Sequence, residues 1–189
     1  MAFEKEVFIE ACKAALSEEP VVLRDLVAEA VSDPAGITAE LGEPTRWGVE
    51  ALHNESDFTV INFVWAPFMT LMPYNHRMGA VIGIYAGRED NIFWRQLDGD
   101  GAPGLEAAGA ESLGPGQVAT LGKDIIHSDA NLTSAIHVYA GNFFEPPEPR
   151  SQWDHETLIE APWDMEDTRA AFREADHRYR AGLAAAPAA

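Results

Sequence analysis

Two tyrosines and three histidines are the side chains of this sequence best suited to do chemistry. Tyr74 and His76 are two residues apart, so in a strand they point to the same side while the residue between them points away. His127 follows a short apolar run and precedes a polar loop, a common position for a ligand on a rigid scaffold. His137 and Tyr139 share one face of another apolar run. Such groups can bind a metal ion or move protons.

The pair formed by His137 and Tyr139 has two explanations. Polar rings inside an apolar strand need partners, because burying a polar group without a hydrogen bond is costly. They either face a functional site or form part of the core, where they satisfy each other or bind water. For His155 and His177, which lie among polar residues, we expect a surface or structural role.

Short apolar runs with a period of two dominate the chain from Trp47 onward. They alternate with turn residues, a pattern typical of an all-β barrel or sandwich. The segment 99–116 is rich in glycine and alanine and is predicted to be a surface loop. The predicted strands are Val49 to His53, Phe58 to Trp65, Thr70 to Tyr74, Val81 to Tyr85, Ile92 to Leu97, Gln117 to Leu121 and Ser134 to Tyr139.

Helical periodicity marks both ends of the chain. Apolar residues spaced by three or four predict helices over residues 3–17, 20–31 and 165–183, with a weaker one over 37–41. A length of 189 residues suits one domain with a core and is short for two. We expect N-terminal helices within 1–45, a barrel over about 46–145, a covering segment and helix over 146–183, and a disordered tail over 184–189.

The charge balance excludes some classes of partner. Aspartate and glutamate outnumber lysine and arginine by 31 to 13, which gives a formal charge of −18. This argues against binding nucleic acid or an anionic membrane through bulk electrostatics. The N-terminus has early acidic residues and no apolar core segment, and no apolar run reaches the length of a membrane span, so a cytoplasmic protein is expected. Cys12 is the only cysteine, which excludes an internal disulfide and a thiolate metal cluster.

Several separate segments resemble, in the right order, the cupin superfamily, in the branch that contains the bacterial thiol dioxygenases, including cysteine dioxygenase. The chain is similar there to bacterial cupins described as predicted metal-dependent enzymes, from about Arg46 to Trp163. The segments that carry the resemblance are Phe63-Val64-Trp65-Ala66-Pro67, His76-Arg77-Met78, Val81-Ile82-Gly83 with Gly87-Arg88-Glu89-Asp90-Asn91, Ile126-His127, and Ala135-Ile136-His137-Val138-Tyr139-Ala140-Gly141.

The resemblance implies a mainly β fold, a double-stranded β-helix or jelly-roll barrel. It also implies one ferrous iron on three histidines, with open positions for substrate and O₂. Two of those ligands carry over onto His76 and His127, whereas Tyr74 stands where the family has the third. The Ser-His-Tyr triad of the thiol dioxygenases corresponds here to Ala135, His137 and Tyr139, so its serine is absent.

The tyrosine at position 74 leaves three outcomes open. A phenol binds iron well mainly as phenolate and favours the ferric state, whereas imidazole suits ferrous iron. Tyr74 could coordinate a metal with His76 and His127, as a Lewis-acid site. It could instead stay neutral as an acid while another group, such as His137, completes a weaker site. In the third outcome the barrel binds a ligand or does acid-base chemistry without metal.

The resemblance also bears on the substrate. Gly79 stands where that branch commonly has tryptophan, which implies a pocket larger by an aromatic side chain and a substrate bulkier than cysteine. Arg46, just before the barrel, is the candidate for binding a substrate carboxylate, and Trp65 is a further candidate for contacting the substrate.

The leading hypothesis is a cysteine dioxygenase-like, metal-dependent oxygenase or related catalyst on a small organic substrate. It would use Fe(II), or another divalent transition metal, and O₂. One alternative is a metal-poor or metal-free isomerase, cyclase or lyase that uses Tyr74, His137 and Tyr139 as acid and base. Another is a ligand-binding barrel without turnover. The protein is expected to be a monomer or a homodimer.

Overall fold

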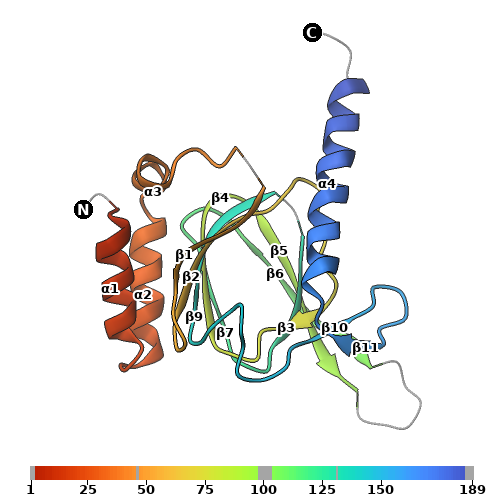
Figure 1. Cartoon of the computed structure of the whole chain (residues 1–189), viewed down its shortest axis with the longest axis horizontal. Helices are drawn as coiled ribbons and strands as arrows, with labels where there is room; N and C mark the ends of the chain where they lie inside the picture. The colour runs from red at the N-terminus through yellow and green to blue at the C-terminus, as the bar shows by residue number, and fades with distance from the viewer. Residues whose placement is uncertain (1–2, 46, 98–103, 131, 186–189) are drawn as a thin grey trace.

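Two antiparallel β-sheets form the body of the protein (Figure 1). The computed structural model describes residues 3–45, 47–97, 104–130 and 132–185. Its strands are β1 (Gly48–Asn54), β2 (Thr59–Val64), β3 (Tyr74–Asn75), β4 (Ala80–Gly87), β5 (Glu89–Gln96), β6 (Leu105–Leu113), β7 (Val118–Leu121), β8 (Ile126–Ala130), β9 (Thr133–Tyr139), β10 (Ser151–Trp153) and β11 (Glu160–Pro162). One sheet has the order β1-β2-β9-β4-β7, and the other β11-β10-β3-β8-β5-β6. The predicted fold class, a mainly β double-stranded β-helix, is confirmed.

Helices cover the barrel from two sides. Figure 1 shows α1 (Lys5–Ala15) and α2 (Pro20–Val31) side by side along the five-stranded sheet, with α3 (Pro34–Leu41) next to them. The C-terminal helix α4 (Met165–Ala185) lies on the opposite side, beyond β3 and β10. None of the described helices is both long and apolar enough to cross a membrane.

Burial on both faces explains the continuous apolar runs of the central strands. Every residue of β2 and β9 is buried. Ile61 belongs to the cluster inside the barrel, whereas its neighbour Val60 packs in a second cluster with Phe8 and Val27 of the helices. A strand that is covered on both sides has no solvent face on which polar residues would be favoured.

The contact between α2 and the sheet depends on Gly83. A Cβ built there would lie 2.5 Å from Val27 Cγ1 and 2.8 Å from Val31 Cγ1, closer than packed methyl groups approach. Gly83→Ala should therefore push α2 outward and lower the free energy of unfolding by about 1–3 kcal/mol. Gly109→Ala in β6 is the matched control, because a Cβ there would meet no atom within 4 Å. Urea denaturation of both variants checks this, and equal stabilities would contradict it.

Strand pairing places the candidate residues opposite one another. Tyr74 of β3 pairs directly with His127 of β8. Asn91 of β5 pairs with Asp129 on the other side of β8. His137 and Tyr139 lie on β9, in the five-stranded sheet. The rings therefore come from opposite sheets and meet inside the barrel.

Three sequence predictions need correction. The predicted loop 99–116 contains the nine-residue strand β6, while residues 98–103 lie outside the described residues. The predicted strand Thr70 to Tyr74 is reduced to an isolated bridge at Thr70 and to the two-residue strand β3. The tail predicted over 184–189 is helical at its start, because α4 continues to Ala185, and residues 186–189 lie outside the described residues.

Candidate functional site

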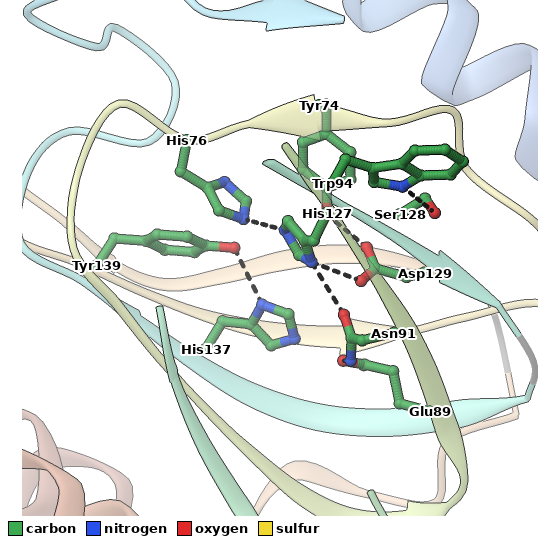
Figure 2. Close-up of polar contacts among 10 residues, drawn as sticks. All are labelled: Tyr74, His76, Glu89, Asn91, Trp94, His127, Ser128, Asp129, His137 and Tyr139. Carbon is green, nitrogen blue, oxygen red and sulfur yellow. Dashed lines mark hydrogen bonds and ion pairs between the residues drawn. The ribbon is translucent and has the colours of Figure 1, made fainter. Parts of the chain in front are cut away.

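His127 is held in one orientation by two oxygen atoms (Figure 2). Its Nδ1 lies 2.9 Å from Asp129 Oδ1 and 2.9 Å from Asn91 Oδ1. The Asn91 amide is itself oriented, because its Nδ2 donates to Glu89 Oε1 at 2.9 Å. Both atoms that face Nδ1 are acceptors, so Nδ1 carries a proton. The lone pair of the neutral ring is therefore on Nε2, which points into the barrel.

His76 completes an imidazole pair with His127. The two Nε2 atoms are 3.1 Å apart, which is hydrogen-bond distance. The other nitrogen of His76, Nδ1, is buried and has no hydrogen-bond partner among the described residues. Burial lowers the pKa of His76 well below 6.5, and the positive charges of His127 and Arg150 lower it further. His76 is therefore the neutral member of the pair.

The charge of Asp129 has the opposite effect on His127. Burial alone would lower the pKa of His127, but the charge of Asp129, its hydrogen bond and the charge of Glu89 together raise it above 6.5. Burial would raise the pKa of Asp129, and the interactions with His127 and Tyr74 outweigh this and lower it below 3.8. The two residues thus interact more strongly when His127 is protonated, which makes His127 a stronger base than a free imidazole.

Tyr74 donates its hydroxyl proton to the second oxygen of Asp129. The distance from Tyr74 Oη to Asp129 Oδ2 is 2.5 Å, typical of a hydrogen bond to a charged acceptor. Burial raises the pKa of Tyr74 well above 10, and the charge of Asp129 adds to this. The phenol is therefore neutral and committed to Asp129, which disfavours the phenolate form that a metal ligand would need.

Replacement of Tyr74 by phenylalanine tests this hydrogen bond. Tyr74→Phe leaves a buried carboxylate oxygen of Asp129 without its donor, so the free energy of unfolding should fall by about 1.5–3 kcal/mol. Tyr85→Phe is the matched control, because Tyr85 donates to the neutral Asn62 amide oxygen at 2.9 Å and its loss should cost only about 1 kcal/mol. Chemical denaturation at neutral pH measures the free energy of unfolding of both variants. If Tyr74→Phe costs no more than Tyr85→Phe, the claim that Tyr74 donates to a charged acceptor is contradicted.

His137 and Tyr139 form a second polar pair from the opposite sheet. His137 Nδ1 lies 3.0 Å from Tyr139 Oη. Burial lowers the pKa of His137 to about 3, so this ring is neutral. Burial likewise raises the pKa of Tyr139 well above 10. The Tyr139 ring lies 5.0 Å from the His76 ring, between centroids, which brings the two pairs into one cluster.

The structure thus brings together five of the residues that the sequence nominated: Tyr74, His76, His127, His137 and Tyr139. Trp65 lies nearby and stacks between Phe63 and Phe172, with ring centroids 5.0 and 5.5 Å away. Its contact with a substrate stays a prediction. Arg46 lies outside the described residues, so its carboxylate-binding role also stays a prediction.

Gly79 lies away from the cluster. It lines a cavity of about 300 Å³ between the start of α2 and the edge of the five-stranded sheet, together with Leu16, Leu23 and Leu121. A Cβ at this position would meet only Leu121 O, at 4.0 Å. The prediction that Gly79 enlarges the substrate pocket is therefore wrong. The space beside this residue lies on the helix side of the sheet, away from the cluster.

Three residues of the cluster were not nominated from the sequence. Asp129 and Asn91 orient His127, and Glu89 orients Asn91. Burial raises the pKa of Glu89 to about 7, with Asp129 adding to the effect. A signal for them exists in the sequence, because Asp129 follows His127 by two residues, and Glu89 and Asn91 are also two apart. Each pair therefore shares one face of a strand.

Arg150 is a further missed residue and has no comparable signal in the sequence. It lies in the connection before β10, is 6% exposed, and places its guanidinium 4.6 Å from the Phe143 ring and 4.9 Å from the Trp163 ring. Its charge lowers the pKa of both His76 and Tyr139, so it lies close enough to the cluster to influence it.

The donor set fits a metal ion only in part. Two imidazole nitrogens bound to one metal at about 2.1 Å lie about 3 Å apart when their angle is near 90°, and the His76 and His127 Nε2 atoms are 3.1 Å apart. The described residues contain no group of three or more His, Cys, Asp or Glu side chains arranged to hold a metal ion. The three-histidine centre that the resemblance implies therefore does not fit these residues, since Tyr74 donates to Asp129 instead.

Comparison with known proteins gives likenesses of fold. No family model matches the sequence. Oxalate decarboxylase from Bacillus subtilis is similar at 13% identity and a TM-score of 0.39, over 51% of this chain and 24% of that one, so the match spans about a quarter of the decarboxylase. An RmlC-like cupin with a double-stranded β-helix fold from Methanocaldococcus jannaschii is similar at 12% identity and a TM-score of 0.42, over 52% of this chain and 84% of that one.

A conserved protein from Streptococcus pyogenes gives a comparable match, at 12% identity and a TM-score of 0.41, over 52% of this chain and 77% of that one. Cupins with the double-stranded β-helix fold are thus among the structural neighbours. The finer resemblance to cysteine dioxygenase stays a prediction.

Proposed function

We propose that this chain is an enzyme that moves protons on a small organic substrate inside the barrel, as an isomerase or lyase does. The observation that carries the proposal is the fixed orientation of His127, whose Nδ1 lies 2.9 Å from Asp129 Oδ1. A carboxylate at Nδ1 holds the imidazole so that Nε2 can accept a proton, and it stabilises the imidazolium that forms. His127 is therefore the general base, and Asp129 is its positioning residue.

His76 keeps the proton on the base. Its Nε2 faces the Nε2 of His127, and its lowered pKa keeps it neutral, so it competes poorly with His127 for a proton. A substrate C–H proton that moves to His127 can be returned by His127 to a different substrate atom without reaching water. In a site that is buried on every side, such internal transfer allows an isomerase to retain the proton.

The phenol of Tyr139 supplies the complementary function. Abstraction of a proton next to a carbonyl group places negative charge on the carbonyl oxygen, and a neutral hydrogen-bond donor stabilises that charge. Tyr139 is neutral because burial raises its pKa. It enters the cluster from the sheet opposite Tyr74, whose own hydroxyl donates to Asp129 and helps to hold that carboxylate in place.

Hydrogen-deuterium exchange into simple carbonyl compounds tests this proposal and does not require the natural substrate. The untagged protein is incubated in D₂O with 2-oxobutanoate and 4-oxopentanoate, with a chelator and without O₂, and loss of the C–H signals next to the carbonyl is followed by NMR. The wild type should accelerate exchange by about 10²-fold over buffer, and His127→Asn should remove the acceleration. No acceleration, or acceleration that survives His127→Asn, would contradict the proposal.

A second candidate function is favoured by one observation, the 3.1 Å separation of the His76 and His127 Nε2 atoms. These two residues could hold a divalent transition metal such as Fe(II), which would supply Lewis-acid or oxygen chemistry when bound. Oxygenase activity of the dioxygenase type belongs to this candidate. Two protein ligands are one fewer than the three that catalytic zinc sites use, which is why we place it second.

Metal analysis of untagged protein distinguishes the two candidates. The proton-transfer function predicts activity in protein that holds less than about a tenth of an equivalent of any transition metal. Near-stoichiometric metal that is lost in His76→Ala, together with activity that requires the metal, would favour the second candidate. Tyr74→His adds a third imidazole, so it should strengthen metal binding if the site is built for metal.

A further inference from the structure

Arg150 differs from every other arginine that the structure describes. Arg24, Arg77, Arg88, Arg95, Arg169, Arg173, Arg178 and Arg180 each form an ion pair with an aspartate or glutamate. Among the described residues, no carboxylate pairs with Arg150, although the chain carries a formal charge of −18. The one arginine without a carboxylate partner in the described part of the chain is thus also a buried one.

The donors of Arg150 are unused as well as buried. Its Nε and Nη1 have no hydrogen-bond partner among the described residues. Any edge of a guanidinium group contains two of its three nitrogens, so every edge of Arg150 includes at least one unused donor. A buried cation with free N–H groups is strongly unfavourable unless an anion joins it.

The surroundings of Arg150 place its guanidinium beside the cluster. The guanidinium lies over the rings of Phe143 and Trp163, which offer π faces and no competing oxygen. Phe143 contacts the Tyr139 ring at 4.6 Å, and Trp163 contacts the Tyr74 ring at 5.1 Å, between centroids. The backbone is fixed beside the cluster, because Ser151 N donates to Asn75 Oδ1 at 3.0 Å.

We propose that Arg150 binds the carboxylate of the substrate, so that the enzyme acts on small organic acids. This deepens the proposed function and rests on it, by naming the substrate class. A carboxylate is planar and carries one negative charge, and it matches the guanidinium through two N–H donors. A phosphate dianion would bring a second negative charge into a buried cluster that already contains the Asp129 carboxylate, which favours the carboxylate. Arg150 would then hold one end of the substrate while the imidazole pair and the phenol of Tyr139 face the other.

Binding measurements with matched anionic and neutral probes test this proposal. Tryptophan fluorescence and the melting temperature are followed as propionate, benzoate, their amides and inorganic phosphate are titrated into the wild type, Arg150→Gln, Arg150→Lys and Arg95→Gln. The carboxylates should bind the wild type, and Arg150→Gln should weaken them by at least about tenfold, with a smaller loss in Arg150→Lys. Arg95→Gln is the control, because Arg95 is exposed and paired with Glu106. It should bind like the wild type.

Three outcomes would overturn the assignment: equal binding of acids and amides, tighter binding of phosphate than of carboxylates, or unchanged binding in Arg150→Gln. The melting temperature of the protein without ligand tests the alternative that Arg150 only supports the fold. If Arg150 is kept for a ligand, Arg150→Met should melt at or above the wild-type temperature without ligand, because it removes an unpaired buried charge. A large drop in melting temperature would overturn the proposal.

The same titration in His127→Asn separates this inference from the proposed function. Carboxylate binding that persists in His127→Asn supports the anion site whether or not the wild type exchanges protons. Deuterium exchange in the wild type without carboxylate selectivity would support the proton-transfer function and overturn the role of Arg150.

Discussion

Asp129→Asn should lower the free energy of unfolding by about 3–5 kcal/mol, because it removes the charge from a buried ion pair and leaves His127 without its counter-ion. The loss should depend on pH in a defined direction. His127 has a folded-state pKa above 6.5, so its contribution is complete below pH 6.5 and is lost as the pH rises through the folded value. Asp129 has a folded-state pKa below 3.8, so its contribution is complete above pH 3.8 and is lost as the pH falls through the folded value.

The cost of Asp129→Asn should therefore be larger at about pH 5.5, where both charges are present, than at about pH 8.5. Urea denaturation at the two pH values measures it. Asp124→Asn is the matched control, because Asp124 forms its ion pair with Arg77 at the surface, 3.2 Å away, and its removal should cost less than about 1 kcal/mol. A cost for Asp129→Asn that is small, or that grows toward high pH, would contradict the charged pair.

Glu89→Gln should stabilise the protein at alkaline pH. Burial raises the pKa of Glu89 from 4.5 to about 7, so the folded protein holds this proton more tightly than the unfolded chain does. The stability of the wild type should consequently fall as the pH rises from about 4.5 to about 7, by on the order of 3 kcal/mol. Glutamine carries no charge and keeps an oxygen to accept from Asn91, so the variant should escape most of this fall.

Denaturation curves from pH 5 to pH 8.5 test the sign of the effect. Glu89→Gln and the wild type should be closest in stability at the low end of this range, should diverge as the pH rises to about 7 and should then keep a constant difference, with the variant the more stable. Glu111→Gln, at an exposed position of β6, should follow the wild type throughout. A variant that loses stability at every pH would show that Glu89 is an ionised structural partner of Asn91 rather than a buried, nearly neutral acid.

The fold was largely predictable because apolar residues recur with a clear helical or strand periodicity in most of the helices and strands. Strands β2, β4 and β9 are continuous apolar runs, since one face packs in the barrel and the other against the helices or the neighbouring core. Strand β6 was missed because seven of its nine residues are not buried, so small and polar residues occupy an edge strand and resemble a loop. Strands β3, β10 and β11 have two or three residues each, too few to show any period.

The histidine and tyrosine rings of the cluster could be predicted from the sequence. Most of the groups that orient these rings could not. His76 was found because it stands two residues after Tyr74, and His127 because it follows a short apolar run and precedes a polar loop. The carboxylate two residues after His127 was visible in the sequence, but its contact with Tyr74 depends on the pairing of β3 with β8. Arg150 could not be found from the sequence, because its burial arises only when the connection before β10 folds against Phe143 and Trp163.

The measurement that tests the central claim most directly is nitrogen-proton correlation NMR of the histidine side chains in the wild type and in Asp129→Asn. We expect that neutral His127 is protonated on Nδ1, with Nε2 bare, and that His127 titrates above 6.5 in the wild type and below 6.5 in Asp129→Asn. A wild-type His127 that is protonated on Nε2 with a bare Nδ1, or that titrates below 6.5, would contradict the claim that Asp129 orients this ring as the base.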